Sequence, residues 1–189
     1  YFKDTDGSFV VVGQDAIERA IERHQSVSRP MVKGVVSPSE PQARRILKFI
    51  IQDILGLPRE PGVKVVFSIP AHPIDYKDDD FNVLYHEDCM KQDLASLGYT
   101  ALALNEAEAI CYSELEDANF TGIASSWGAG CVNVCVMSSG EAIIKFSLAK
   151  SGDAVDRMAA AATGEPDSVV QFDKEHGDFV IGQEHPTSR

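Results

Sequence analysis

The chain has 189 residues, of which 44% are hydrophobic and 24% charged, a balance that excludes an intrinsically disordered protein. Its 17 basic and 29 acidic residues give a formal net charge of -12, which repels phosphate backbones, so nucleic acid is not expected as a partner. No apolar stretch reaches the roughly 20 residues of a membrane-spanning helix. The longest, Ile46 to Leu57, is interrupted by Lys48, Gln52 and Asp53, so we expect no transmembrane segment.

The amino terminus and the cysteines indicate whether the chain is part of a longer one and which compartment it occupies. The first residues contain neither an initiating Met nor an apolar signal core, so we expect a piece of a longer chain. Cys131 and Cys135 lie in one strand-like run, about 13 Å apart at about 3.3 Å per residue, which is too far for a disulfide. Without a C-x-x-C pair or a histidine at ligand spacing, the pattern predicts four free thiols, buried or half-buried, rather than a metal site. Free thiols favour a reducing compartment, the cytoplasm.

Apolar runs of strand length alternate with helix-like segments over the first part of the chain. The expected strands are 9–12, 31–36, 63–69 and 99–104, and the expected helices are 14–24, 41–55, 81–97 and 106–115. The run 63–69 is almost continuously apolar, which predicts a strand covered on both faces. A helix of crossover length separates it from 99–104, so these two strands are expected to pair in parallel within an open α/β sheet.

The pattern changes near residue 119. Three short strands over 122–127, 132–137 and 143–148 are joined by tight, Gly-containing connections, which predicts an antiparallel meander. A helix over 153–162 follows, and two β-prone runs, 168–172 and 178–181, predict a final hairpin. The change divides the chain into two units, residues 1–118 and residues 119–189.

The segment Ser126-Trp127-Gly128-Ala129-Gly130 is a Gly-rich turn between two predicted strands. Small residues let backbone N–H groups approach an anion closely, so such a turn can hold phosphate oxygens without a basic side chain. The alternative is a tight hairpin without a ligand. Gly152 and Asp153 open the next helix and offer a second anion site at its N-terminus, although Ser or Asp there is ordinarily only a cap.

Glu106 lies where a predicted strand ends and a helix begins, which is the usual edge for ligands in open α/β sheets. A carboxylate there can hold an attacking water; the alternative is a first-turn Glu favoured by the helix dipole. The acidic stretch Asp78 to Asp80 lacks the pattern of a calcium loop and is expected to be a solvated loop. His72 and His86 have no partner at a spacing that suggests a relay, and they are assigned no role.

Several motifs together resemble those of actin-like and heat-shock-chaperone ATPases. The strand 65–71 resembles V-x-x-x-V-P-A, 104–109 resembles the connecting motif E-P-x-A-A, and 122–136 is similar to the second phosphate loop D-x-G-G-G-T-x-x-x-x-V. Residues 152–156 resemble the G-G-D/E-x-x-D helix start. Upstream, 12–16 and 29–36 are most similar to the bacterial actin MreB, with its V-G-x-x-A and R-P-L-x-x-G-V-I patterns. The order holds over about residues 9 to 165.

The resemblance implies an α/β, actin-like (ribonuclease H-like) ATPase fold with two lobes, incomplete in this chain, and ATP with Mg²⁺ in the cleft between the lobes. Residues 1–118 would belong to subdomain I and residues 119–189 to subdomain II, which carries the second phosphate loop. By that comparison Gly128, Ala129 and Gly130 border the β- and γ-phosphates, and Glu106 positions the hydrolytic water. Gly152 and Asp153 lie near the nucleotide on the second lobe.

The sequence also departs from the family pattern. Ser126 stands where the second phosphate loop has an acidic residue, and Ala107 stands where the connecting motif has Pro. The segment between Pro70 and Glu106 is longer than in MreB, and neither the first phosphate loop nor the adenosine motif is found in the sequence. Hydrolysis is therefore expected to be slow or lost.

The function expected from the resemblance is that of a cytoskeletal protein that polymerises into filaments under the control of ATP. The alternatives are a degenerate scaffold or binding module without turnover, supported by Ser126, and a chaperone-type or small-molecule-kinase member of the same superfamily.

Overall fold

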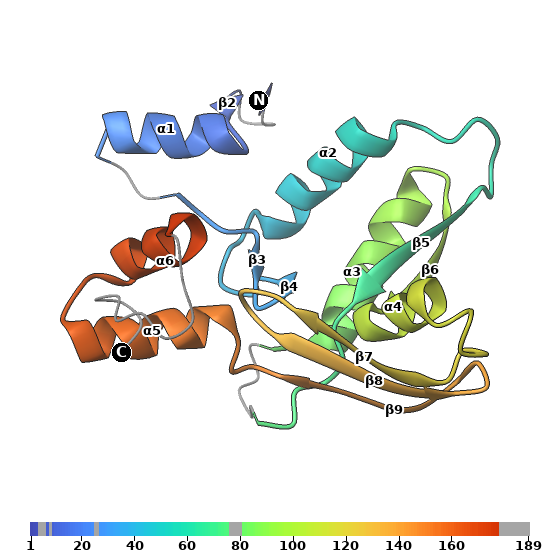
Figure 1. The fold of residues 1–189 in the computed structure, drawn as a ribbon. Helices are drawn as coiled ribbons and strands as arrows, with labels where there is room; N and C mark the ends of the chain where they lie inside the picture. Colours follow the sequence, from blue (N-terminus) through green and yellow to red (C-terminus); the bar gives the residue numbers. More distant parts are fainter. Residues whose placement is uncertain (4–6, 8, 25–26, 76–80, 178–189) are drawn as a thin grey trace.

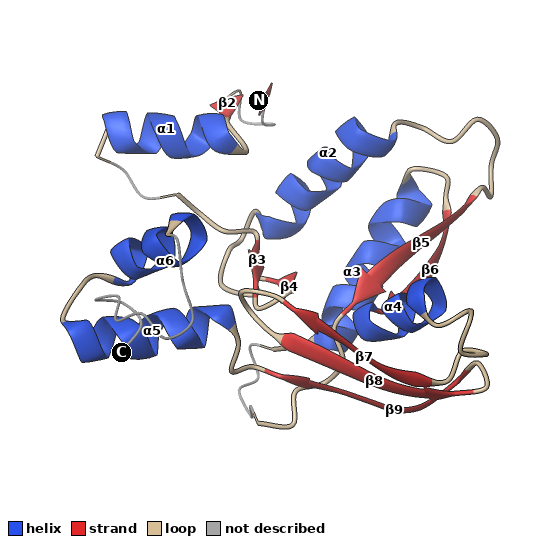
Figure 2. Ribbon diagram, in the orientation of Figure 1, coloured by secondary structure: helices blue, strands red, loops and turns tan. Residues whose placement is uncertain are grey.

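The computed structural model describes residues 1–3, 7, 9–24, 27–75 and 81–177 of a mixed α/β chain (Figure 1; Figure 2). The strands are β1 (Phe2–Lys3), β2 (Phe9–Val10), β3 (Met31–Val32), β4 (Val35–Val36), β5 (Lys64–Ile69), β6 (Thr100–Asn105), β7 (Gly122–Trp127), β8 (Val132–Ser138) and β9 (Glu141–Leu148). The helices are α1 (Gln14–Glu22), α2 (Ala43–Leu55), α3 (Val83–Ser96), α4 (Glu106–Glu114), α5 (Gly152–Thr163) and α6 (Asp167–His176). Among the described residues, every helix is too short or too polar to cross a bilayer.

Strands β5 and β6 pair in parallel, with Lys64 opposite Thr100 and Ile69 opposite Asn105. Helix α3 makes the crossover between them and packs against β6, so the parallel pairing expected from the sequence is confirmed. The expectation that both faces of this strand are covered is wrong for the described part of the chain, because Val66 is 59% exposed. Among the described residues, the side chains of β5 are half-buried on one face and exposed on the other.

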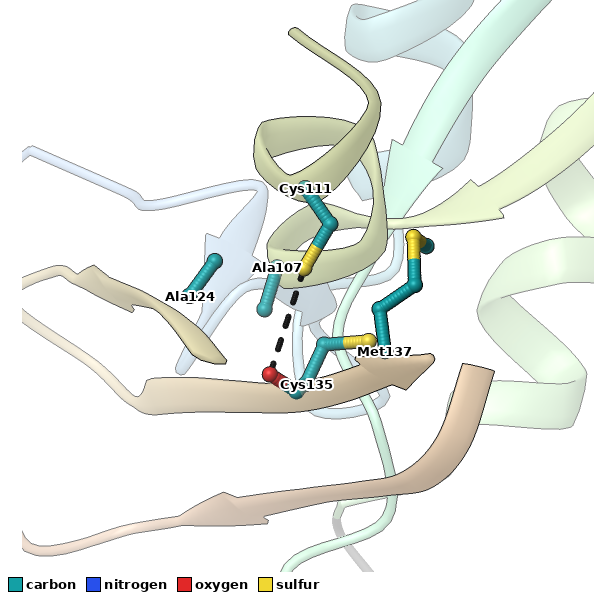
Figure 3. Packing of buried hydrophobic residues seen from close by; sticks show 5 residues of the cluster. All are labelled: Ala107, Cys111, Ala124, Cys135 and Met137. Atoms are coloured by element: carbon teal, nitrogen blue, oxygen red, sulfur yellow. Dashed lines mark hydrogen bonds between the residues drawn. The ribbon is translucent and has the colours of Figure 1, made fainter. Parts of the chain in front are cut away.

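Strands β7, β8 and β9 form an antiparallel meander, as expected, and α4 packs against one face of it (Figure 1). Figure 3 shows the core between them, in which Ala107 and Cys111 of α4 meet Ala124, Cys135 and Met137 of the sheet. The thiol of Cys111 points at the carbonyl oxygen of Cys135, 3.9 Å away. This core joins elements on both sides of residue 118, and the division at that residue stays a prediction.

All four cysteines are free and buried, as the sequence predicted. Burial and the neighbouring thiol of Cys111 raise the pKa of Cys135 to about 11. Burial, reinforced by the charge of Glu106, raises the pKa of Cys131 to about 11. Both thiols are therefore neutral near pH 7 and pack as small apolar groups.

Residues 31–36 form a tight hairpin rather than the single strand expected. Lys33 and Gly34 occupy the turn with φ of 53° and 83°, and Met31 pairs with Val36. Positive φ at both central residues is typical of the two-residue turn that matches the twist of paired strands. The valines on both sides of Lys33 and Gly34 gave the whole segment a strand-like pattern, so the sequence did not predict the turn.

Residues 168–172 lie in α6, so the prediction of a final hairpin is wrong for its first strand. Its second predicted strand, 178–181, lies outside the described residues. Pro166 precedes the helix with extended backbone, and its carbonyl oxygen accepts from the amides of Val169 (2.9 Å) and Val170 (3.2 Å). Lys174 then anchors α6 on α5 by donating to Asp156, with 2.8 Å between Nζ and Oδ2. Tertiary docking thus overrides the β-propensity of the two valines in this segment.

Candidate functional site

The carboxyl ends of the parallel strands define one edge of the molecule. β6 ends at Asn105, and Glu106 is the first residue of α4. Asn105 caps this helix, because its side-chain oxygen accepts from the backbone N–H groups of Ala107 (3.1 Å) and Glu108 (3.2 Å). The cap fixes where the helix begins and leaves the half-buried carboxylate of Glu106 at the edge where open α/β sheets bind ligands.

The meander brings two polar side chains to this carboxylate. Asn133 of β8 donates from Nδ2 to Glu106 Oε2 at 2.8 Å, and Ser126 of β7 donates from Oγ to the same oxygen at 3.4 Å. Within the described part of the chain no donor lies within hydrogen-bonding distance of Glu106 Oε1. The structure thus brings together Glu106 and Ser126, two residues singled out from separate motifs.

Asn133 was missed in the sequence and is fully buried. Its Oδ1 accepts from the backbone N–H of Ala71, just beyond the carboxyl end of β5, at 2.8 Å. One side chain therefore connects the ends of both parallel strands to the meander. The signal that could have found it is an amide in the otherwise apolar run 132–137, since a buried amide requires partners for both of its ends.

The Gly-rich loop follows β7. The amide of Gly128 donates to the carbonyl of Cys131 at 3.0 Å, which closes the turn. The amides of Ala129 and Gly130 have no protein acceptor among the residues that the structure describes. Two unpaired amides in a row of small residues are the donors that an anion such as a phosphate group needs.

Gly130 packs directly against the tip of the β3–β4 hairpin. A Cβ at this position would overlap Lys33 Cα and lie 2.9 Å from its carbonyl carbon, so only glycine fits. Gly34 of the same hairpin lies next to Cys131, since a Cβ on Gly34 would be 3.5 Å from the Cys131 sulfur. The hairpin therefore supports the loop from one side.

The start of α5 also holds the loop. The amides of Gly152 and Asp153 donate to the carbonyls of Gly128 (3.2 Å) and Ala129 (2.8 Å), and Ser151 Oγ also donates to Ala129. The two candidate anion-binding segments are thus adjacent, but these two helix amides already have protein acceptors. A Cβ on Gly152 would also lie 3.5 Å from Lys174 Nζ, which is paired with Asp156 of α5.

The donor set sets limits on a metal. No group of three or more His, Cys, Asp or Glu side chains that could hold a metal ion occurs among the described residues. At the edge described above Glu106 supplies one carboxylate and Ser126 a hydroxyl, while the amide oxygen of Asn133 is taken by Ala71. Mg²⁺ commonly takes one or two carboxylates and completes its shell with water and phosphate oxygens. The residues therefore fit Mg²⁺ only as an ion carried by a phosphate group.

The sequence pattern assigned no site role to His86 or to the acidic stretch Asp78 to Asp80. His86 is buried and accepts the backbone N–H of Val36 at Nδ1, 3.3 Å away, which is a packing role. Asp78 to Asp80 lie outside the described residues. A cavity of about 1060 Å³ borders α1 and α2, but none of the residues at the Glu106 edge lines it, so hydrogen bonds rather than this cavity define the site.

Comparisons with known proteins bear on the family and the fold of the chain. A family model described as Volactin matches residues 1–188, and no curated protein matches. The chain is 14% identical to MreB 5 of Spiroplasma citri bound to AMPPNP, with a TM-score of 0.67 over 97% of this chain and 56% of that one. The chain is 19% identical to the MamK double helical filament, with a TM-score of 0.59 over 91% of this chain and 48% of that one.

A third solved structure, the ethanolamine utilization protein EutJ from Carboxydothermus hydrogenoformans, is 16% identical with a TM-score of 0.53, over 80% of this chain and 51% of that one. These likenesses confirm the actin-like ATPase fold expected from the sequence. The chain spans about half the length of the solved structures it matches.

Proposed function

Because the chain belongs to the volactin family and has an actin-like ATPase fold, we propose that it binds ATP and that the bound nucleotide controls its polymerisation into filaments. The observation that carries the proposal is a Gly-rich loop, with two amides that have no acceptor among the described residues, next to Ser126, which donates to the carboxylate of Glu106. One matched structure is described as a filament and another as bound to AMPPNP, which supports both halves of the proposal.

In this proposal Gly128, Ala129 and Gly130 border the β- and γ-phosphates, with the free amides of the last two donating to phosphate oxygens. Gly152 and Asp153 lie next to the nucleotide and hold the loop in shape through their hydrogen bonds to it. Mg²⁺, when bound with the phosphates, supplies positive charge that offsets theirs. The free thiols support placing the protein in the cytoplasm.

The proposed hydrolytic role belongs to Glu106. Its Oε1 accepts a hydrogen bond from the attacking water and so orients it towards the terminal phosphate. Ser126 offers a neutral hydroxyl where related phosphate loops carry a carboxylate, so turnover is expected to be slow. That hydroxyl favours a second candidate function, a nucleotide-binding scaffold that assembles without hydrolysis.

The single tryptophan of the chain provides the binding test. Trp127 is 78% exposed and precedes Gly128 directly, so its fluorescence should change when the loop takes up a phosphate group. We expect a saturable change on titration with ATP and Mg²⁺, and none with adenosine. Trp127→Phe removes the fluorophore, so calorimetry on this variant shows whether ATP still binds when the fluorescence signal is lost. Absence of binding in both assays would contradict the proposal.

Assembly and turnover are measured separately. Light scattering should rise above a critical protein concentration when ATP and Mg²⁺ are added, because a head-to-tail interface that does not close gives an open filament. Steady-state phosphate release from the parent and from Glu106→Ala then distinguishes the two candidates. A parental rate that falls by about 10² or more in the variant supports the ATPase. Assembly without phosphate release in either protein supports the scaffold.

A further inference from the structure

We propose that Asn133 is a positioning residue for Glu106: it occupies Oε2 of the carboxylate and thereby leaves Oε1 turned to the attacking water. This inference rests on the proposed function, because it assigns a task to a side chain at the same site. It is drawn from the hydrogen bonds and the burial of Asn133, which no sequence motif singled out.

The orientation of the Asn133 amide follows from its partners. The backbone N–H of Ala71 can only donate, so the atom that faces it at 2.8 Å must be the amide oxygen. The amide nitrogen must then face Glu106, where a carboxylate oxygen accepts at 2.8 Å. The flipped amide would place two donors together at one end and two acceptors together at the other. The contact to Glu106 is therefore fixed by a backbone group on a different element.

Burial makes this contact strong and its geometry narrow. Asn133 is 0% exposed, so water does not compete for its amide, and hydrogen bonds to a charged acceptor are stronger than those between neutral groups. Ser126 reaches the same Oε2 from 3.4 Å, a longer and weaker contact. Asn133 thus sets the direction of the carboxylate, and Ser126 adds to it.

A structural alternative is that Asn133 only ties Ala71 to the meander. Ser147 offers a matched control, because its Oγ donates to the carbonyl oxygen of Ala71 at 2.7 Å and it is also 0% exposed. Ser147→Ala removes an anchor from the same residue of the chain without touching Glu106. Any effect that comes from anchoring Ala71 should therefore appear in this variant too.

Asn133→Asp is the sharpest perturbation. It keeps the size of the side chain and the oxygen that accepts from Ala71, but replaces the donor facing Glu106 by a second carboxyl oxygen. While the introduced carboxyl group is protonated it can still donate to Glu106; once it ionises, two negative charges face each other. The thiol of Cys131 also accepts from Asn133 Nδ2, at 3.5 Å, but with a pKa of about 11 it stays neutral near pH 7. The change should therefore be mild at low pH and large at high pH.

The first experiment measures ATP affinity and steady-state phosphate release against pH for the parent, Asn133→Asp and Ser147→Ala. We expect phosphate release by Asn133→Asp to fall about 10²-fold as pH rises, with ATP affinity changed less than about threefold and with activity recovering at low pH. Ser147→Ala should keep the parental pH profile. A parental profile in Asn133→Asp, or an equal and pH-independent loss in both variants, would overturn the inference.

A second measurement needs no nucleotide. The side-chain amide of Asn133 is observed by NMR in the full chain and identified by its disappearance in Asn133→Asp. We expect its proton shifts to move in Glu106→Ala and to stay as in the parent in Ser147→Ala. Unchanged shifts in Glu106→Ala would refute the positioning contact even in a protein that binds ATP. Shifts that move in a protein that binds no ATP would support the contact while the proposed function fails.

Discussion

Replacing Gly130 by alanine tests whether the hairpin and the Gly-rich loop are packed as tightly as the structure indicates. The added methyl would overlap Lys33 Cα and lie 2.9 Å from its carbonyl carbon. Carbon atoms in contact are separated by about 3.5–4.0 Å, so the carbonyl carbon alone requires the hairpin and the loop to part by about 0.6 Å, and the closer Lys33 Cα requires more. Both partners are backbone, which cannot turn aside as a flexible side chain can. Overpacking of this kind costs about 1–3 kcal/mol.

Gly128→Ala is the matched control, since it lies in the same loop and its nearest neighbour would be the carbonyl oxygen of Cys131 at 3.3 Å. Both substitutions restrict the unfolded chain and so gain about 0.4–1 kcal/mol, which cancels in the comparison. At roughly 2–4 °C per kcal/mol for a chain of this size, Gly130→Ala should melt about 2–12 °C below Gly128→Ala.

The assay is thermal and urea unfolding of the parent and of both variants, followed by circular dichroism. If the overlap is relieved by separation of the loop from the hairpin, ATP affinity measured by calorimetry should also fall in Gly130→Ala. Equal midpoints for the two variants would refute the reasoning, because they would mean that the backbone of Lys33 does not occupy the space beside Gly130.

Three further outcomes are expected. Arg44→Met should destabilise the chain by about 1–3 kcal/mol in urea unfolding, because the carboxylate of Asp93, which is 8% exposed, loses its bidentate partner at 3.0–3.2 Å. The loss is limited because the arginine is half-exposed. An unchanged unfolding midpoint would contradict this prediction. Burial lowers the pKa of His86, so as pH falls the unfolded state binds a proton before the folded state does, and stability should decrease below about pH 6.5. His86→Gln should make stability depend less steeply on pH in this range. The same pH dependence in the variant would rule out this histidine as its source. Cys131 and Cys135, each with a pKa of about 11, should react with a thiol reagent at pH 8 only after unfolding in urea; fast reaction in the folded chain would show that they are accessible.

Much of the fold is determined by the sequence itself. The parallel pairing of β5 with β6 follows from two apolar runs separated by a helix of crossover length, and the meander follows from short strands with tight connections. The place of Glu106 follows as well, because a strand that ends at Asn105 and a helix that begins there put the next side chain at the ligand edge. These features depend on local periodicity and turn chemistry, which a sequence displays directly.

Other features were decided only by the tertiary structure. Asn133 meets Glu106 and Ala71 across 27 and 62 positions of the chain, and no local pattern carries a contact of that range. Gly130 requires glycine because Lys33 approaches it from a hairpin far upstream, not because of its own turn. Residues 168–172 become a helix by docking on α5. In each case the free energy comes from long-range packing or hydrogen bonding, which outweighs the preference of the local segment.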